Sequence, residues 1–362
     1  EIMPSLVGSE MCIRDSQYIY IIIVAILSLG VLQHRRLLDQ KESLINSVFL
    51  CVVLVLFIGL RPHSYVFGDT INYASWWGMI PWEGWNWNLS NKIFDNIYNY
   101  MGSTFPDATL FFLLMAAIYF LCMLMACRKL FPANTLIVFL VCLSAFSTFS
   151  YGTNGIKAGA AASLFLVALA YRDKIWVSIV FLLLSWGIHH SMQLPIVAYV
   201  LTLIFKNEKW YFYGWLFCLL MAIGHVSFFQ NLFAEITDDS GASYLSSTGE
   251  NWGGKSGFRI DFVIYSMMPV LIGYYVKYKY KLEDKLYDIM LNIYLVCNGV
   301  WMLCMYANFN NRIAYLSWFI YPILLVYPCY AIEDENHPLV LNRKKIVLGH
   351  LGFTLFLSLI HI

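Results

Sequence analysis

The sequence predicts an all-α membrane protein with about twelve spanning helices and both termini outside. Of the 362 residues, 60% are hydrophobic and only 12% are charged, about half the charged share of an ordinary soluble domain. The apolar residues form long runs separated by short charged loops, which is typical of multi-pass membrane proteins. The formal net charge of +1 gives no reason to expect a nucleic-acid partner.

Several of the predicted spans are shorter than the roughly 20 residues that a helix perpendicular to the membrane needs. The weakest pair also fits a re-entrant hairpin with His189 and His190 at its tip. The spans cover residues 17–32, 44–60, 108–127, 135–151, 155–171, 175–188, 192–205, 210–229, 262–276, 286–307, 314–332 and 346–362, the weakest pair being 175–188 with 192–205.

The two ends of the chain resemble translated sequencing-adapter read-through. Residues 1–16 contain Ser-Leu-Val-Gly-Ser-Glu-Met-Cys-Ile-Arg-Asp-Ser, and residues 357–362 read Leu-Ser-Leu-Ile-His-Ile. We therefore expect an artefactual leader over 1–16, a single transmembrane domain over 17–356 and a second artefactual segment over 357–362.

The basic residues give the expected orientation. Sixteen of the 23 Lys and Arg residues fall in one set of alternating loops, which the positive-inside rule assigns to the cytoplasm. These loops are 33–43, 128–134, 172–174, 206–209, 277–285 and 333–345. The long loops 61–107 and 230–261 are then expected on the outer face.

The two outer loops differ in composition. The loop 61–107 is rich in aromatic residues, among them Tyr73, Trp76 and Trp77. Such residues usually form an interfacial belt, but together with several asparagines they also suit stacking on sugar rings. The stretch 238–255 is rich in Gly, Ser and Asp, so we expect a mobile lid there.

The stretch 149–163 places a polar turn between two apolar runs. Thr153 or Asn154 can cap the helix that follows, and Lys157 lies one turn into it, where a helix favours an anion. The small residues after Lys157 allow a neighbouring helix or a lipid tail to approach closely. The alternative is an ordinary turn between two membrane helices.

Basic residues are sparse on the expected outer face. Arg61, Lys157, Arg259 and Arg312 each lie near the end of a span. Any one of them can be a snorkelling anchor. Four cations at a similar depth can also converge on one anionic group, and a diphosphate suits guanidinium groups.

Three side chains are candidate proton acceptors. Asp69 either caps a short helix through Tyr73 or acts as a base toward a sugar hydroxyl. His189 and His190 stand between two apolar runs, where a histidine needs a partner, whether its role is structural or catalytic.

The cluster 308–312, with Asn311, is either a solvated turn or part of a site. The sequence contains no metal-binding or nucleotide-binding motif, so no cofactor is expected.

These segments in this order resemble the EpsG family, relatives of the Wzy polymerases of exopolysaccharide and O-antigen synthesis. Arg61 followed by Gly68-Asp-Thr-Ile-Asn-Tyr73 is similar to the family's Arg and Gly-x-Asp-x-x-x-Tyr. Thr153-Asn-Gly-Ile-Lys157 is similar to its Thr-Asn-Gly-(Ile/Leu)-Arg, with lysine in place of arginine. His189-His-Ser191 and Arg312 are similar to two later motifs.

The resemblance implies a GT-C-like, metal-independent glycosyltransferase of the bacterial cytoplasmic membrane. Its donor would be a glycan on undecaprenyl diphosphate and its acceptor the terminal sugar of another lipid-linked unit. Arg61, Lys157, Arg259 and Arg312 would bind the diphosphate, and Asp69, His189 or His190 would take the hydroxyl proton. Thr153, Asn154, Tyr73, Trp76, Trp77 and Asn311 would contact substrate.

Further partners implied are membrane lipids, a flippase and a chain-length regulator. Two alternatives remain open. One is a flippase or transporter of lipid-linked sugars, and the other is a membrane O-acyltransferase acting on the polysaccharide.

Overall fold

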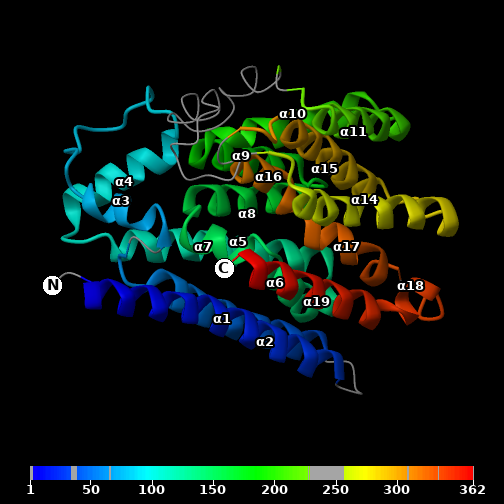
Figure 1. Ribbon diagram of the computed structural model, residues 1–362, viewed down its shortest axis with the longest axis horizontal. Helices are drawn as coiled ribbons and strands as arrows, with labels where there is room; N and C mark the ends of the chain where they lie inside the picture. The colour runs from blue at the N-terminus through cyan, green and yellow to red at the C-terminus, as the bar shows by residue number, and fades with distance from the viewer. Residues whose placement is uncertain are drawn as a thin grey trace. The chain divides into compact units, whose positions relative to one another are not determined.

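The computed structural model is all-helical over the residues it describes (Figure 1). These are residues 3–33, 39–64, 67–226, 228, 257–307, 310–332 and 334–361, with side chains described from 16 to 358. The chain divides into two compact units. Unit 1 comprises Glu1–Ile188 with Cys329–Ile362, and unit 2 comprises His189–Pro328.

Unit 1 is built from helices of very different length. Its long helices are α1 (Met3–Gln33), α2 (Gln40–Gly59), α5 (Thr109–Leu130) and α19 (Arg343–His361), with α8 (Ile156–Ala170) and α9 (Ile175–Ile188) somewhat shorter. The short helices are α3 (Thr70–Ser75), α4 (Lys92–Thr104), η2 (Pro132–Asn134), α6 (Thr135–Ser144), α7 (Thr148–Thr153) and α18 (Pro338–Leu341).

Unit 2 contains η3 (His190–Met192), α10 (Gln193–Ile204), α11 (Glu208–Ile223), α14 (Ile260–Tyr280), α15 (Lys285–Leu303) and α16 (Asn311–Trp318). Helix α17 (Tyr321–Tyr330) crosses the boundary between the units. Helix α15 packs against α10, α11, α14 and α16. Its Asn298 accepts a hydrogen bond from Trp215 (2.9 Å) and donates one to Ser317 (3.2 Å). These bonds satisfy a buried amide in an apolar core.

Each predicted span coincides with one or two helices. Within the described residues, six helical segments are long and apolar enough to cross a membrane: Ser16–Gln33, Gln40–Gly59, Thr109–Leu130, Ile260–Tyr280, Lys285–Leu303 and Asn311–Tyr330. The chain is thus an integral membrane protein. The other predicted spans coincide with shorter helices or with α19, so the count of twelve crossings stays a prediction. Helix α9 packs on α8 in unit 1, whereas α10 packs on α15 in unit 2.

The small residues of α8 have the structural role that the sequence predicted. Helix α8 packs between α5 and α9, and Ala160, Ala161 and Ala168 are completely buried. From α9, Ser185 donates a hydrogen bond to the carbonyl of Ala161 (2.7 Å), and Ser178 donates one to that of Ala168 (3.0 Å). A neighbouring helix, rather than a lipid tail, therefore covers this face.

The predicted span 135–151 is broken into α6 and α7 at Ala145, whose backbone is extended (φ −63°, ψ 141°). A break inside an apolar run leaves carbonyl groups without helical partners, which is costly away from water. Side chains donate to two carbonyls at this break. Thr148 donates to the carbonyl of Cys142 (2.6 Å), and Tyr20 of α1 donates to that of Leu143 (2.8 Å).

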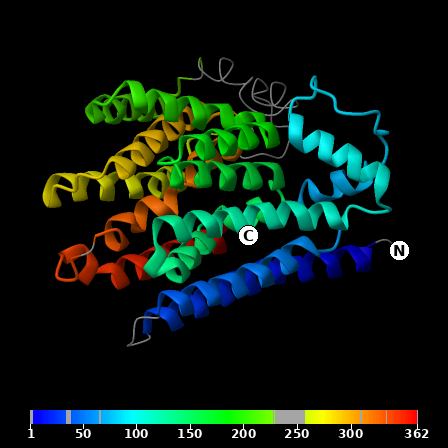
Figure 2. The same ribbon diagram turned by 180° about the vertical axis from the view of Figure 1, so that it is seen from behind.

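Helices α1 and α2 run alongside each other in both views of the chain (Figures 1 and 2). Both pack on α6, so α6 forms a floor between them. The two ends of α2 give reference points in unit 1: Gln40 marks the predicted cytoplasmic end, and Arg61, just after α2, marks the predicted outer end. Described residues of three predicted cytoplasmic loops, among them Asp39, Ala133 and Arg343, line a common cavity near the first residue of α2, Gln40.

Candidate functional site

Arg61 ties three separate segments of unit 1 together at the end of α2. Its Nη1 donates to the carbonyl of Ile58 (2.8 Å). Its Nη2 donates to the hydroxyl of Thr70 (2.8 Å) and to the carbonyl of Thr153 (2.9 Å). The Thr70 hydroxyl also donates to the carbonyl of Thr153 (2.7 Å). The ends of α2 and α7 and the start of α3 are thereby fixed to one guanidinium group.

Arg61 is 6% exposed, and its guanidinium lies over the rings of Phe112 and Phe67, with Cζ 4.7 and 5.8 Å from the ring centroids. Burial lowers the pKa of Arg61 to about 10, so the group remains charged at neutral pH. Because Ile58 and Thr153 lie at the carboxyl ends of helices, their carbonyls carry partial negative charge that compensates the cation. Among the described residues, its buried Nε has no hydrogen-bond partner.

Gly68 and Asn154 fit together beside this cluster. Gly68 has φ +59°, and a Cβ on it would lie 2.5 Å from Cγ of Asn154. The space left by the missing side chain lets Asn154 Oδ1 accept a hydrogen bond from the backbone N–H of Asp69 (2.9 Å). The adjacent Gly-Asp pair and the Thr-Asn-Gly turn are therefore complementary parts of one structure.

The predicted cap of α8 is wrong. The residue preceding α8 is Gly155, which makes no side-chain cap bond. The hydroxyl of Thr153 donates to the carbonyl of Phe149 (2.9 Å), and the side chain of Asn154 accepts from the N–H of Asp69. One partner lies in α7 and the other 85 residues earlier in the chain. Because both side chains are engaged by these partners, neither caps α8. The first N–H groups of α8 still lack intrahelical acceptors.

Lys157 lies in the first turn of α8 and is half-buried. Its Nζ lies 5.4 Å from the ring of Phe94 in α4. Lys157 and Arg61 are thus held on adjoining segments of unit 1, since Thr153 bonds to Arg61 and Lys157 follows Thr153 by four residues.

Asp69 occupies the N-cap position of α3, as predicted, but makes no side-chain cap bond. Its backbone carbonyl accepts from Tyr73 N–H (3.2 Å) instead. The carboxylate is half-buried beside the Asn154 contact. Its role as a base stays a prediction.

The aromatic residues of loop 61–107 separate into two groups. Tyr73 packs edge-on against Phe94 and Tyr98, and Trp77 donates its indole N–H to the carbonyl of Phe105 (2.9 Å). Trp76 and Trp87, by contrast, are 62% and 68% exposed. Tyr73 and Trp77 are therefore part of the loop's own core, while Trp76 presents a ring that can meet a sugar or lipid headgroups.

The predicted histidines belong to unit 2. His189 is 8% exposed and precedes η3, where its Nδ1 accepts from the N–H of Ser191 (3.4 Å). His190 is half-buried, with its ring centroid 5.7 Å from that of His189. The sequence predicted that these histidines need partners, and the bond to Ser191 gives His189 a structural role at the start of η3.

Arg259 and Arg312 also lie in unit 2. Arg259 forms a two-pronged ion pair with Asp261, with Nε–Oδ1 and Nη2–Oδ2 distances of 3.1 and 2.7 Å, and its guanidinium lies 4.0 Å from the ring centroid of Phe262. Arg312 and Asn311 are half-buried in the first turn of α16. The convergence of these two arginines with Arg61 and Lys157 on one diphosphate stays a prediction. The predicted lid at 238–255 lies outside the described residues.

Sequence reasoning missed two residues. Thr70 is fully buried and bridges Arg61 to Thr153; its position next to Asp69 in the motif was the available signal. Asn310 is 2% exposed and donates to the carbonyls of Met305 (2.7 Å) and Ala307 (3.2 Å). These bonds tie the residue before α16 to the end of the preceding described segment, a role that only the folded chain reveals.

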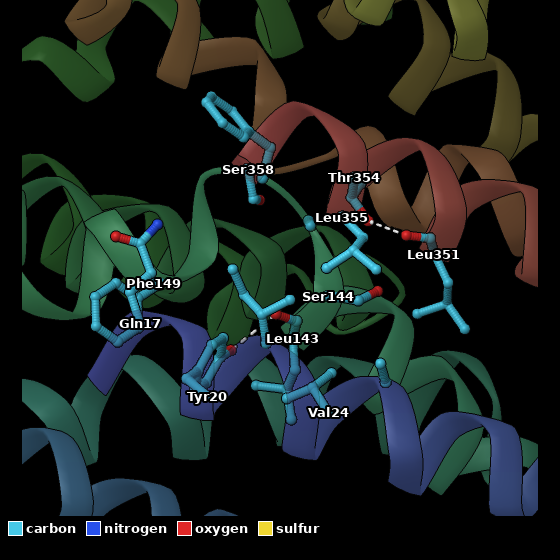
Figure 3. Close-up of a pocket in the computed structure, with 14 residues that line it drawn as sticks. Gln17, Tyr20, Val24, Leu143, Ser144, Phe149, Leu351, Thr354, Leu355 and Ser358 are labelled. Atoms are coloured by element: carbon cyan, nitrogen blue, oxygen red, sulfur yellow. Dashed lines mark hydrogen bonds between the residues drawn. The ribbon is translucent and has the colours of Figure 1, made fainter. Parts of the chain in front are cut away.

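A small cavity between α1, α6 and α19 is lined partly by hydroxyl groups (Figure 3). Its volume of about 20 Å³ is room for about one water molecule. Tyr20 and Thr354 already donate to backbone carbonyls there. This cavity cannot hold a sugar. Among the described residues, no cluster of three metal-ligating side chains occurs.

One comparison with known proteins identifies the chain. No curated protein and no solved structure shows a significant match. The model of the EpsG family matches residues 44–362, which include every candidate site residue and most of the chain. The chain therefore belongs to the EpsG family.

Proposed function

We propose that the protein polymerises lipid-linked polysaccharide repeat units at the bacterial cytoplasmic membrane. It would move a glycan from undecaprenyl diphosphate to the terminal sugar hydroxyl of a second lipid-linked unit. No metal or cofactor is required in this scheme. The observation that carries the proposal is the family match over residues 44–362, because membership of the EpsG family indicates a role in exopolysaccharide synthesis.

The reaction exchanges one bond for another. The bond between the anomeric carbon and the diphosphate oxygen breaks, and a bond from that carbon to the acceptor oxygen forms. The hydroxyl proton passes to a base, for which Asp69, His189 and His190 are candidates. The departing diphosphate keeps the electron pair and requires cations nearby.

Lys157 is the unit 1 cation that best fits the leaving group. It stands in the first turn of α8, where the helix dipole also favours an anion. Arg61 has both terminal nitrogens engaged by Ile58, Thr70 and Thr153. In this proposal it acts first as a positioning residue that holds α7, and hence Lys157, against α3. Arg259 and Arg312 would complete the diphosphate site.

The first experiment replaces Lys157 by alanine in cells that depend on this protein for polymer. We expect chain growth to fall by at least a hundredfold, on the order of a lost electrostatic contact in a transition state, while Lys157→Arg retains it. Lys92→Ala is the matched control, since Lys92 is also half-buried with its Nζ 5.6 Å from an aromatic ring, that of Trp186. Polymer length is measured on gels, and membrane insertion by immunoblot.

The accumulated intermediate separates the polymerase from the alternatives. Single repeat units on the lipid at the outer face support polymerisation. Units retained on the cytoplasmic face would indicate a flippase, and full-length chains without acyl groups would indicate an acyltransferase. Normal polymer in both Lys157→Ala and Arg312→Ala would refute the assignment of the anion site.

A further inference from the structure

A polar cavity of about 370 Å³ opens at the predicted cytoplasmic end of unit 1. It lies among the end of α1, the start of α2, η2 with α6, and the start of α19. This volume is within the range of ligand sites, roughly 300–1,000 Å³. The cavity is at the opposite end of α2 from Arg61, so it is separate from the site proposed for the diphosphate.

Charges of both signs line this cavity. Among the described residues that line it, Arg343 and Lys344 supply two positive charges, and Asp39 and Glu335 supply two negative ones. Arg343 is half-buried, with its guanidinium 5.8 Å from the ring of Tyr330. Within the part of the chain that the structure describes, neither basic residue forms an ion pair. A ligand bearing both a phosphate and an ammonium group can therefore pair with both sets of charges.

A second cavity of about 330 Å³ adjoins the first and is lined almost entirely by apolar side chains. The two cavities share Val31 and Leu136. The second lies between α1 and α2, with α6 as its floor. At Gly30, an added Cβ would meet nothing within 4 Å, so the groove is open there. A polar end that continues into an apolar groove matches an amphiphile.

We propose that one phospholipid with a zwitterionic headgroup, of the phosphatidylethanolamine type, occupies both cavities. Its phosphate lies at Arg343 and Lys344, and its ammonium group faces Asp39 and Glu335. One acyl chain runs along the groove between α1 and α2. A purely anionic headgroup fits less well, because two carboxylates line the same space. This lipid fills the gap that α1 and α2 leave over α6.

The test measures which lipid the intact protein retains. The full chain is exchanged into nanodiscs that contain phosphatidylethanolamine, phosphatidylglycerol and phosphatidylcholine in equal amounts, and bound lipid is counted by native mass spectrometry. We expect about one phosphatidylethanolamine per chain to be retained. Arg343→Ala with Lys344→Ala, and separately Gly30→Leu, should each reduce retention about tenfold, a loss of one headgroup or chain contact.

Matched controls keep these variants interpretable. Lys345→Ala removes a neighbouring exposed lysine that does not line the cavity, and Gly349→Leu adds a side chain at another open helical glycine. Both should retain the lipid. Gly30→Leu should also fold, because leucine favours a helix more than glycine does. Thermal unfolding checks each variant.

Three outcomes would overturn the proposal. Equal retention of all three lipids would mean ordinary boundary lipid. Preference for phosphatidylglycerol would contradict the pairing with Asp39 and Glu335. Release of the lipid by inorganic phosphate, with no effect of Gly30→Leu, would assign the polar cavity to a free phosphate instead.

Discussion

The most informative residue of the candidate site is a buried arginine that has no carboxylate partner among the described residues. Arg61 is compensated by two carbonyls at helix ends, one hydroxyl and two aromatic rings. Replacing it with lysine would lose the fork that reaches Ile58 and Thr153 together. The residue therefore determines the geometry of the site, whether or not it touches phosphate.

Thr70→Val tests this clamp. Valine has nearly the same shape as threonine but removes the hydroxyl that accepts from Arg61 and donates to Thr153. We expect a loss of about 1–3 kcal/mol of stability, seen as a lower unfolding temperature in detergent, together with reduced chain growth. Thr104→Val is the control, since Thr104 is exposed and bonds only to Tyr100 in its own helix. Equal effects of the two substitutions would contradict the clamp.

Gly68→Ala tests the fit between the two motifs. The positive φ costs an L-residue about 1–2 kcal/mol, and the new Cβ also collides with Asn154. Combining it with Asn154→Ala relieves the collision and leaves the strain. We therefore expect the double variant to be more stable than Gly68→Ala alone, as measured by thermal unfolding. Gly84→Ala, at φ +110° with nothing within 4 Å of the added Cβ, shows the effect of a positive φ without a collision, at a φ that costs an L-residue more than that of Gly68.

At the residue scale, the sequence could indicate which segments matter but not how they bond. The motifs of Arg61, Asp69 and Lys157 stood out because polar residues are rare in so apolar a chain. Local rules assigned Asn154 to the next helix, yet its partner is the N–H of Asp69. No local pattern contains that information, since the contact depends on how α3 and α7 meet.

At the scale of elements, hydropathy located the helices well and their breaks poorly. The predicted span 135–151 is apolar throughout, so periodicity gave no reason to divide it at Ala145. The break is stable because Thr148 and Tyr20 supply donors to the freed carbonyls. One of these donors, Tyr20 of α1, is 123 residues away from Leu143 in the chain. A prediction from local sequence therefore cannot include it.

Tyr20→Phe tests the break between α6 and α7. It leaves the buried carbonyl of Leu143 without its donor, which we expect to cost about 1–3 kcal/mol. The measurement is thermal unfolding of the purified protein, with Tyr18→Phe as the control from the same helix. An unchanged unfolding temperature would show that the break does not depend on α1.

At the scale of the whole molecule, the predicted topology can be tested directly. The described cysteines are mostly buried in helices, so a single introduced cysteine can report its side of the membrane. Asn88→Cys should react with an impermeant maleimide in intact spheroplasts. Lys345→Cys should react only after the membrane is opened. The reverse pattern would invert the orientation of every loop.

The family match begins at residue 44, so an expression clone could be shortened to start at that residue. Such a clone would omit Tyr20, and the carbonyl of Leu143 would lose the hydroxyl that donates to it. Helix α1 therefore stabilises the break between α6 and α7, and it should not be treated as a dispensable extension. Anyone trimming the gene to its recognisable part should expect a protein that inserts but packs badly around that point.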